Sequence, residues 1–126
     1  MKLTDVQKIL GAQLVWDSNR VDRVVRSCHA SDLISDMLTF QGPSSLLLTG
    51  LTNAQVIRTA EILDFIAICF VRGKNPQADT VELAKKRELP LFVTDLTMYE
   101  SCGRLYKNGL PGTTRREADD NCQKKI

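Results

Sequence analysis

Apolar residues recur at helical spacing in four segments of the chain, and each segment opens with a pair of residues typical of a helix start. In a capping box, a Ser, Thr or Asp side chain accepts from a first-turn amide, and a Glu or Gln three residues later reaches back. The pairs are Thr4 with Gln7, Thr52 with Gln55, Asp79 with Glu82, and Thr97 with Glu100. The apolar positions that follow predict amphipathic helices with these inward residues: Val6, Ile9, Leu10, Val56, Ile57, Ala60, Leu63, Val81, Ala84, Met98, Tyr99, Cys102, Leu105 and Tyr106.

The ends of these helices are marked by residues that stop a helix. Gly11 and Gly109 can adopt the left-handed conformation that closes a last turn, and Pro90 cannot continue a helix. A fifth, shorter helix is expected from about Asp32 to Phe40, with Gly42-Pro43 ending it. Its inward residues would be Leu33, Ile34, Met37 and Leu38.

Between the predicted helices lie short apolar runs that are typical of strands buried on both faces. They span residues 46–48, 66–71 and 91–93. Two earlier segments, residues 13–16 and 24–28, mix polar and apolar positions and suit the edges of a sheet. Strands that alternate with helices predict an α/β fold, here a single domain with a short, mostly parallel sheet flanked by helices. We expect this domain to span residues 1–109, with a polar, flexible tail over residues 110–126.

Composition narrows the function classes. The chain has 126 residues, 43% hydrophobic and 25% charged, with a formal net charge of +2 that is spread along the sequence. Such weak, scattered charge disfavours a nucleic-acid partner. No apolar run reaches the roughly 18 residues of a spanning helix, so no membrane role is expected. The first residues turn acidic and amphipathic and lack the apolar core of a signal peptide, which predicts a cytoplasmic protein.

Candidate catalytic and metal-binding residues are few. Cys28, Cys69, Cys102 and Cys122 form no CxxC pair, which disfavours both structural disulfides and a zinc site. His29, the only histidine, adjoins Cys28, but neighbouring residues of a strand point to opposite faces and could not form a thiol–imidazole pair. Asp32 and Asp36 would share a helix face and could suit Mg²⁺, although two carboxylates are too few for a dedicated site. We therefore predict no metal, no cofactor and no enzymatic activity.

A binding site is predicted from position alone, because no Gly-rich phosphate loop and no GxSxG nucleophile motif occurs. Open parallel sheets bind ligands at the carboxyl ends of their strands, where loops meet helix N-termini. The residues expected there to hold a ligand are Ser31, Asp32, Thr49, Thr52, Asn53, Arg72 and Lys74. Their hydroxyls, amide and two cations could bind a phosphate or a nucleotide. The competing interpretation is structural, with Thr52 and Asn53 serving as caps and the cations merely solvated.

One stretch, residues 22–36 (DRVVRSCHASDLISD), resembles the opening signature of the DRTGG domain family. Later segments agree with that family: Leu46-Leu47-Leu48-Thr49, residues 66–73, which end in Val-Arg-Gly, and Leu89-Pro90-Leu91-Phe92 followed by Tyr99-Glu100. The resemblance covers about residues 2–105. Ser27-Cys28 stand where the family has paired glycines. The resemblance implies a small α/β fold similar to the N-terminal domain of HPr kinase.

The resemblance also implies a function. Domains of this family accompany other modules, such as pyrophosphatases with paired CBS domains, in regulatory or dimer-forming roles without established catalytic residues. We therefore expect a non-catalytic regulatory domain that binds a small phosphorylated ligand such as an adenine nucleotide. It would form a homodimer and act on a regulated enzyme. The alternative is a dimerisation or partner-binding module without a small-molecule ligand.

Overall fold

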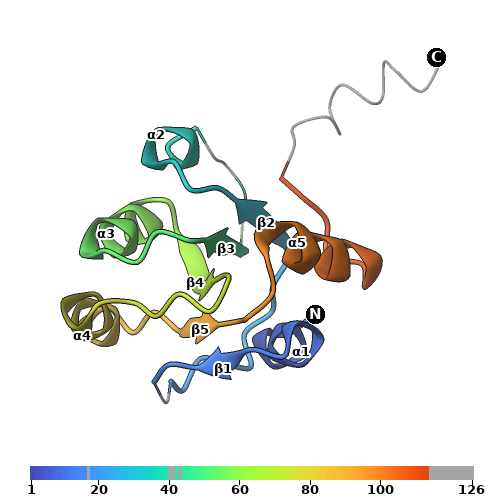
Figure 1. Ribbon diagram of the computed structural model, residues 1–126, viewed down its shortest axis with the longest axis horizontal. Coiled ribbons are helices and arrows are strands. Elements are labelled where there is room, and N and C mark those ends of the chain that lie inside the picture. The colour runs from blue at the N-terminus through green and yellow to red at the C-terminus, as the bar shows by residue number, and fades with distance from the viewer. Residues whose placement is uncertain (17, 40–41, 43, 114–126) are drawn as a thin grey trace.

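The computed structural model describes residues 1–16, 18–39, 42 and 44–113, and the fold below refers to these residues. A five-stranded sheet lies between two layers of helices, with α2, α3 and α4 on one face and α1 and α5 on the other (Figure 1). The strands are β1 (Gln13–Leu14), β2 (Ser27–Ala30), β3 (Ser45–Thr49), β4 (Phe65–Phe70) and β5 (Leu91–Val93). The helices are α1 (Leu3–Leu10), α2 (Ile34–Met37), α3 (Ala54–Ile62), α4 (Ala78–Lys86) and α5 (Met98–Lys107).

The sheet confirms the predicted fold class. Its order is β1-β5-β4-β3-β2, with β2 to β5 parallel and β1 antiparallel to β5. Every residue of β3 and β4 is buried, as the continuous apolar runs predict. Both predicted edge segments do form the edges. However, β2 begins at Ser27 rather than at Val24, which is half exposed and makes only an isolated bridge to Lys2.

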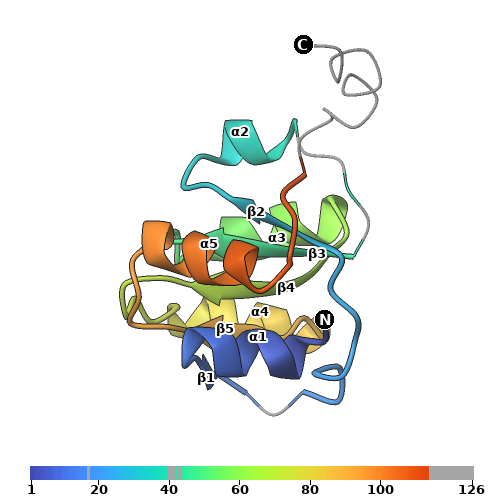
Figure 2. The same cartoon turned by 90° about the vertical axis from the view of Figure 1, so that its right-hand side faces the viewer.

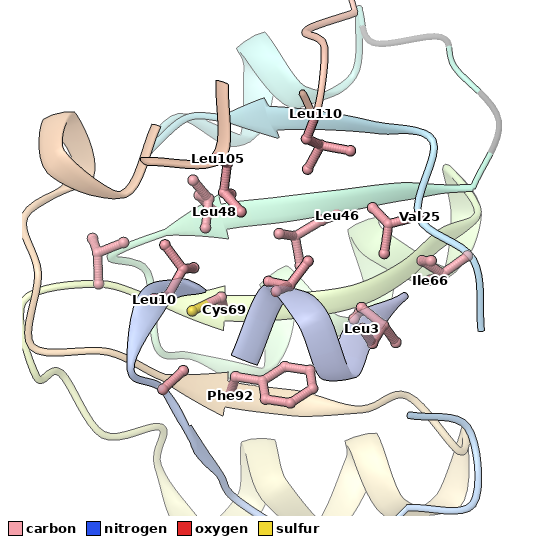
Figure 3. Close-up of a cluster of buried hydrophobic side chains, with 14 residues drawn as sticks. Leu3, Leu10, Val25, Leu46, Leu48, Ile66, Cys69, Phe92, Leu105 and Leu110 are labelled. Atoms are coloured by element: carbon pink, nitrogen blue, oxygen red, sulfur yellow. The ribbon is translucent and has the colours of Figure 1, made fainter. Parts of the chain in front are cut away.

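Two apolar clusters form the core, one on each face of the sheet. The cluster under α1 and α5 includes Leu3, Leu10, Leu46, Leu48, Cys69, Phe92 and Leu105 (Figure 3). The cluster under α2, α3 and α4 includes Met37, Leu47, Val56, Ile57, Ile68, Phe70 and Leu91. Successive residues of β3 therefore alternate between the clusters, because strand side chains point to opposite faces. This two-sided burial explains why β3 and β4 carry no polar alternation.

Only one of the four predicted capping residues caps a helix. Thr97 accepts from the amide of Glu100 at 3.2 Å at the start of α5, which confirms that prediction. The other three are wrong. Thr4 lies inside α1, whose start is closed by the Lys2 amide donating to Asp5 at 2.8 Å. Asp79 likewise lies inside α4, which begins after Gln77.

Thr52 lies one residue before the cap of α3, and its backbone carbonyl is bonded to the start of another helix. Asn53 is the residue before α3, and its side chain makes no capping hydrogen bond. The carbonyl of Thr52 instead accepts from the amide of Gln77 at 3.2 Å and from the Thr80 hydroxyl at 2.8 Å. Both donors belong to the start of α4, so the loop after β3 is tied to the loop after β4. Sequence spacing cannot reveal such a tertiary partner.

Four predicted inward residues are instead exposed. Tyr99 and Tyr106 of α5 are 86% and 74% exposed, and the buried face of α5 is formed by Ser101 and Leu105. Leu33 and Leu38 are also exposed, because α2 is a single turn whose one fully buried side chain is Met37. The predicted end of this helix at Phe40 and Pro43 lies outside the described residues.

The packed structure continues past residue 109. Leu110 is buried in the α1–α5 cluster, and the Pro111 carbonyl accepts from the Cys28 amide of β2 at 3.0 Å. Figure 2 shows this segment leaving α5 and passing over β2. Residues 110 and 111 thus belong with the domain, while residues 114–126 of the proposed tail lie outside the described residues. Within the described part of the chain, no helix is long and apolar enough to cross a membrane.

Candidate functional site

The four parallel strands end at one edge of the sheet, and the loops that follow them contact one another there. We call this the strand-end site and define it by Asp32, Thr49, Gly50 and Arg72. The Ser31 amide donates to the Leu48 carbonyl at 3.0 Å, which carries the pairing of β2 and β3 up to the first loop. The predicted positions therefore do share one edge, as parallel topology requires.

Asp32 is the centre of this site. One of its carboxylate oxygens accepts from the buried Gly50 amide at 2.6 Å and from the Thr49 hydroxyl at 3.4 Å. The other oxygen lies 3.8 Å from the Arg72 guanidinium. Asp32 thus joins the loops after β2, β3 and β4, and its role is tertiary rather than that of a helix cap. The Thr49 hydroxyl also accepts from the Leu51 amide at 3.1 Å.

Arg72 lies on a tight turn with an uncommon backbone. Arg72 and Gly73 have φ of 58° and 64°, and the Lys74 amide donates to the Val71 carbonyl at 3.2 Å. Two left-handed central residues define a type I′ turn, in which a non-glycine residue such as Arg72 is uncommon. The turn is held from the next loop, since the Arg72 and Gly73 amides donate to Leu96 and Thr94 carbonyls at 2.8 Å each.

Gly50 explains how the Arg72 side chain reaches Asp32. A Cβ at Gly50 would lie 2.7 Å from the Arg72 Nη2 and 3.3 Å from an Asp32 carboxylate oxygen. The missing side chain of Gly50 thus leaves the space over the loop after β3 to the guanidinium as it lies here. Sequence reasoning missed Gly50, although a glycine directly after a buried strand signals close approach of another group. The guanidinium remains half exposed and accessible to a ligand.

The four other predicted residues have different roles or positions. The Ser31 hydroxyl accepts from the Leu33 amide at 3.0 Å and so shapes its own loop. Thr52 and Asn53 lie at the start of α3, and the Asn53 side chain is exposed. Lys74 is exposed on the turn after Arg72. Of the seven predicted residues, Asp32 contacts Thr49 and Arg72, and the other four lie in the same loops or at the start of α3.

His29 and Cys28 face opposite sides of β2, as the strand geometry predicts. The His29 ring lies over Phe65, with ring centroids 6.3 Å apart, and its Nε2 is 3.4 Å from an Asp36 carboxylate oxygen. Cys28 instead packs against the α1–α5 cluster. Asp36 pairs with His29 while Asp32 pairs with Arg72, so the two carboxylates serve different contacts. Among the described residues, no three His, Cys, Asp or Glu side chains are placed to hold a metal ion.

The described cysteine thiols all have raised pKa values. Burial, and then the neighbouring Cys102 and Cys69 thiols, raise the pKa of the Cys28 thiol. Burial raises the pKa of Cys69 to about 12 and also raises the pKa of Cys102. Since the thiolate is the nucleophile, these shifts disfavour cysteine catalysis at neutral pH.

A groove of about 620 Å³ lies away from the strand-end site, beside α5. Cys28 and Ala30 of β2, Leu110 and Pro111 line it from one side, and the two exposed tyrosines of α5 line it from the other. Its lining is thus predominantly apolar, in contrast to the charged strand-end site. Sequence reasoning missed this groove because it assigned both tyrosines to the core.

Comparison with known proteins finds a solved structure of similar fold. No protein-family model matches the chain, and no curated protein matches it. Among solved structures, the chain is similar to the CBS and DRTGG domains of the regulatory region of Clostridium perfringens pyrophosphatase, which was crystallised with its activator diadenosine tetraphosphate. The TM-score is 0.70 at 14% identity, over 82% of this chain and 45% of that chain. The chain therefore shares a fold with part of that regulatory region, and it spans less than half of its length.

Proposed function

We propose that this domain is regulatory and non-catalytic, and that it binds a small phosphorylated ligand, such as an adenine nucleotide, at the strand-end site. The observation that carries the proposal is the position of Arg72. Its half-exposed guanidinium crosses Gly50, four residues before α3 begins at Ala54. A cation and a helix N-terminus together form the usual environment of a bound phosphate.

The groups needed to hold a phosphate are present at this edge. The first-turn amides of α3 receive no side-chain cap from Asn53, which leaves donors at this helix start for an anion. Arg72 and the exposed Lys74 supply positive charge, and Thr52 and Ser31 border the site. The Asp32 carboxylate lies 3.8 Å from the Arg72 guanidinium. Such a half-exposed pair contributes about 0–1 kcal/mol, so a phosphate can replace the carboxylate at little cost.

The structural comparison supports the same function. The similar regulatory region belongs to a pyrophosphatase and is complexed with an activator that contains adenine nucleotides. A domain that shares the fold of a regulatory region fits a role as the controlling part of an enzyme system. In that role it would act on a partner enzyme inside the cytoplasm.

Thermal denaturation with candidate ligands tests the proposal. Diadenosine tetraphosphate, ATP, ADP and AMP are compared with inorganic phosphate and adenosine, each at millimolar concentration. A ligand present at 100 times its dissociation constant stabilises the fold by about 2.7 kcal/mol, which raises the midpoint by several degrees. Stabilisation by the phosphorylated compounds but not by adenosine supports binding at the strand-end site. If none of them raises the midpoint, the ligand-binding function is wrong.

Two substitutions locate the ligand. Arg72→Ala should abolish the stabilisation, whereas Asp32→Asn should increase it, because the amide oxygen still accepts from Gly50 but no longer competes for Arg72. Arg87→Ala is the matched control. Arg87 is 51% exposed and pairs with Glu61 at 3.5 Å, much as the 48% exposed Arg72 pairs with Asp32. A ligand effect equally sensitive to Arg87 and Arg72 would place binding elsewhere.

The alternative function, a dimerisation or partner-binding module without a small ligand, is favoured by a different observation. Tyr99 and Tyr106 expose large aromatic side chains on one face of α5. Exposed aromatic residues that gather beside a groove mark interaction surfaces. Failure of every phosphorylated ligand would leave this alternative as the function of the domain.

A further inference from the structure

We propose that the outward face of α5 is the surface through which two copies of this chain pair, with their α5 helices packed antiparallel and crossing at Gly103. This proposal does not depend on the ligand, because α5 lies on the opposite face of the sheet from α3 (Figure 1). The surface consists of Tyr99, Glu100, Gly103, Tyr106 and Lys107, which we call the α5 face. All five residues are exposed in the single chain.

The two tyrosines are the apolar part of the α5 face. They are seven residues apart, so they lie two turns apart on nearly the same side of the helix. At 86% and 74% exposure they contribute little to the core of their own chain. Tyrosine is enriched at interfaces because it buries a large ring while keeping its hydroxyl hydrated.

Gly103 has no explanation within one chain. Glycine in the middle of a helix is destabilising by about 1 kcal/mol relative to alanine. Apart from its chain neighbours and the backbone of α5, no described atom lies within 4 Å of the place where its Cβ would be, and its φ is not left-handed. Neither crowding nor backbone conformation therefore requires glycine here. A second helix that crosses at this point would require glycine, because the missing side chain allows the two helix backbones to approach closely.

The charges on the α5 face identify the second helix as another α5. Glu100 and Lys107 lie two turns apart and flank Gly103 from either side. A two-fold axis near Gly103 that packs the helices antiparallel places Glu100 of each copy beside Lys107 of the other. Both pairs form at once, which is the self-complementarity that a symmetric dimer requires. A parallel arrangement would instead bring like charges together.

The edges of the sheet offer no comparable surface. The edge strand β1 has only two residues, and the Cys28 amide of the other edge strand, β2, already donates to the Pro111 carbonyl. Dimerisation by extension of the sheet, which exposed edges would favour, is therefore restricted. The 620 Å³ groove beside α5 instead gives an apolar floor of Cys28, Ala30 and Leu110 for an aromatic ring from the second copy.

Sedimentation equilibrium of the full chain over a concentration series tests the proposal. The wild type is expected to form a dimer of twice the chain mass. Gly103→Gln should raise the dimer dissociation constant at least tenfold, and at the same time raise the thermal midpoint of the dilute monomer, since glutamine favours helix over glycine. Opposite changes in dimer affinity and fold stability are not expected from a substitution that merely damages the fold.

Ile62→Ala is the matched control. Ile62 is 75% exposed on α3, across the sheet from α5, and its truncation should leave the dimer dissociation constant unchanged. Tyr99→Ala and Tyr106→Ala should each raise that constant at least tenfold. If Ile62→Ala weakens the dimer as much as the tyrosine substitutions do, the α5 face is not the interface.

Charge reversal tests the antiparallel arrangement. Glu100→Lys and Lys107→Glu should each weaken self-association, and the chain carrying both substitutions should recover it, because every cross-helix pair again joins opposite charges. Circular dichroism confirms that each variant is folded. A wild-type chain that stays monomeric at several hundred micromolar would overturn the proposal, and so would a dimer that no α5 substitution affects.

Discussion

The strand-end site and the α5 face differ in how many contacts their residues make within a single chain. At the strand-end site, the Asp32 carboxylate, the Gly50 amide and the Arg72 guanidinium contact one another, and four loops are joined by backbone hydrogen bonds. On the α5 face, by contrast, Tyr99, Tyr106 and Gly103 are exposed to solvent. The first region is therefore organised within one chain, whereas the side chains of the second are left largely exposed by that chain.

The sharpest test of this contrast lies within α5 itself. Leu105 is buried against the sheet, and Tyr106 beside it points outward. Leu105→Ala should lower the free energy of unfolding by about 2–5 kcal/mol, because it leaves a cavity in the core. Tyr106→Ala, measured at concentrations where the chain is monomeric, should change it by no more than about 0.5 kcal/mol. Urea denaturation measures both, and similar losses would mean that the outward face of α5 does stabilise the single chain.

At the strand-end site, Asp32→Ala should lower the free energy of unfolding by about 1–3 kcal/mol, because the buried Gly50 amide loses its acceptor. Asp32→Asn retains an acceptor oxygen and should recover most of that loss. The half-exposed Arg72 contributes less, so Arg72→Ala should have a smaller effect than Asp32→Ala. Equal stability of the two Asp32 variants would show that the hydrogen bond to Gly50 does not hold the loops together.

The described thiols lie on the α5 side of the sheet and give that side a distinct pH response. Burial raises the pKa of Cys69 from its ordinary value of 9.0 to about 12. Between pH 9 and 12 the folded chain therefore binds more protons than the unfolded chain, so the free energy of unfolding falls as pH rises. The contribution is complete below pH 9 and is lost toward pH 12. Cys69→Ala should make this fall shallower in denaturant titrations, and an unchanged slope would contradict the burial of the thiol.

The smallest expected effect concerns the buried side of α5. The Ser101 hydroxyl is buried and has no hydrogen-bond partner within the described residues. Ser101→Ala removes a buried, unsatisfied polar group and improves helix propensity, so it should stabilise the fold by up to about 1 kcal/mol. Thermal denaturation measures the change. A destabilised Ser101→Ala variant would indicate that the hydroxyl is hydrogen-bonded, for instance to water.

The α/β class followed from the sequence because it depends on local periodicity. The short, uniformly apolar runs at 46–48, 66–71 and 91–93 have the length of buried strands, and the segments between them repeat at helical spacing. The shared edge of Ser31, Asp32, Thr49, Arg72 and Lys74 followed as well, since parallel strands necessarily place their following loops together.

The contacts among those residues were decided only by the tertiary structure. Asp32 was expected on a helix face beside Asp36, yet it accepts from an amide 18 positions further along. Thr52 was expected to cap α3, although its carbonyl accepts from the start of α4. The outward direction of Tyr99 and Tyr106 was hidden for the same reason. Helical spacing shows that α5 has an apolar stripe, but only the packing of Ser101 and Leu105 against the sheet determines which side faces the core. Local pattern thus specified the elements, and the rotation of each element against its neighbours specified the surfaces on which function depends.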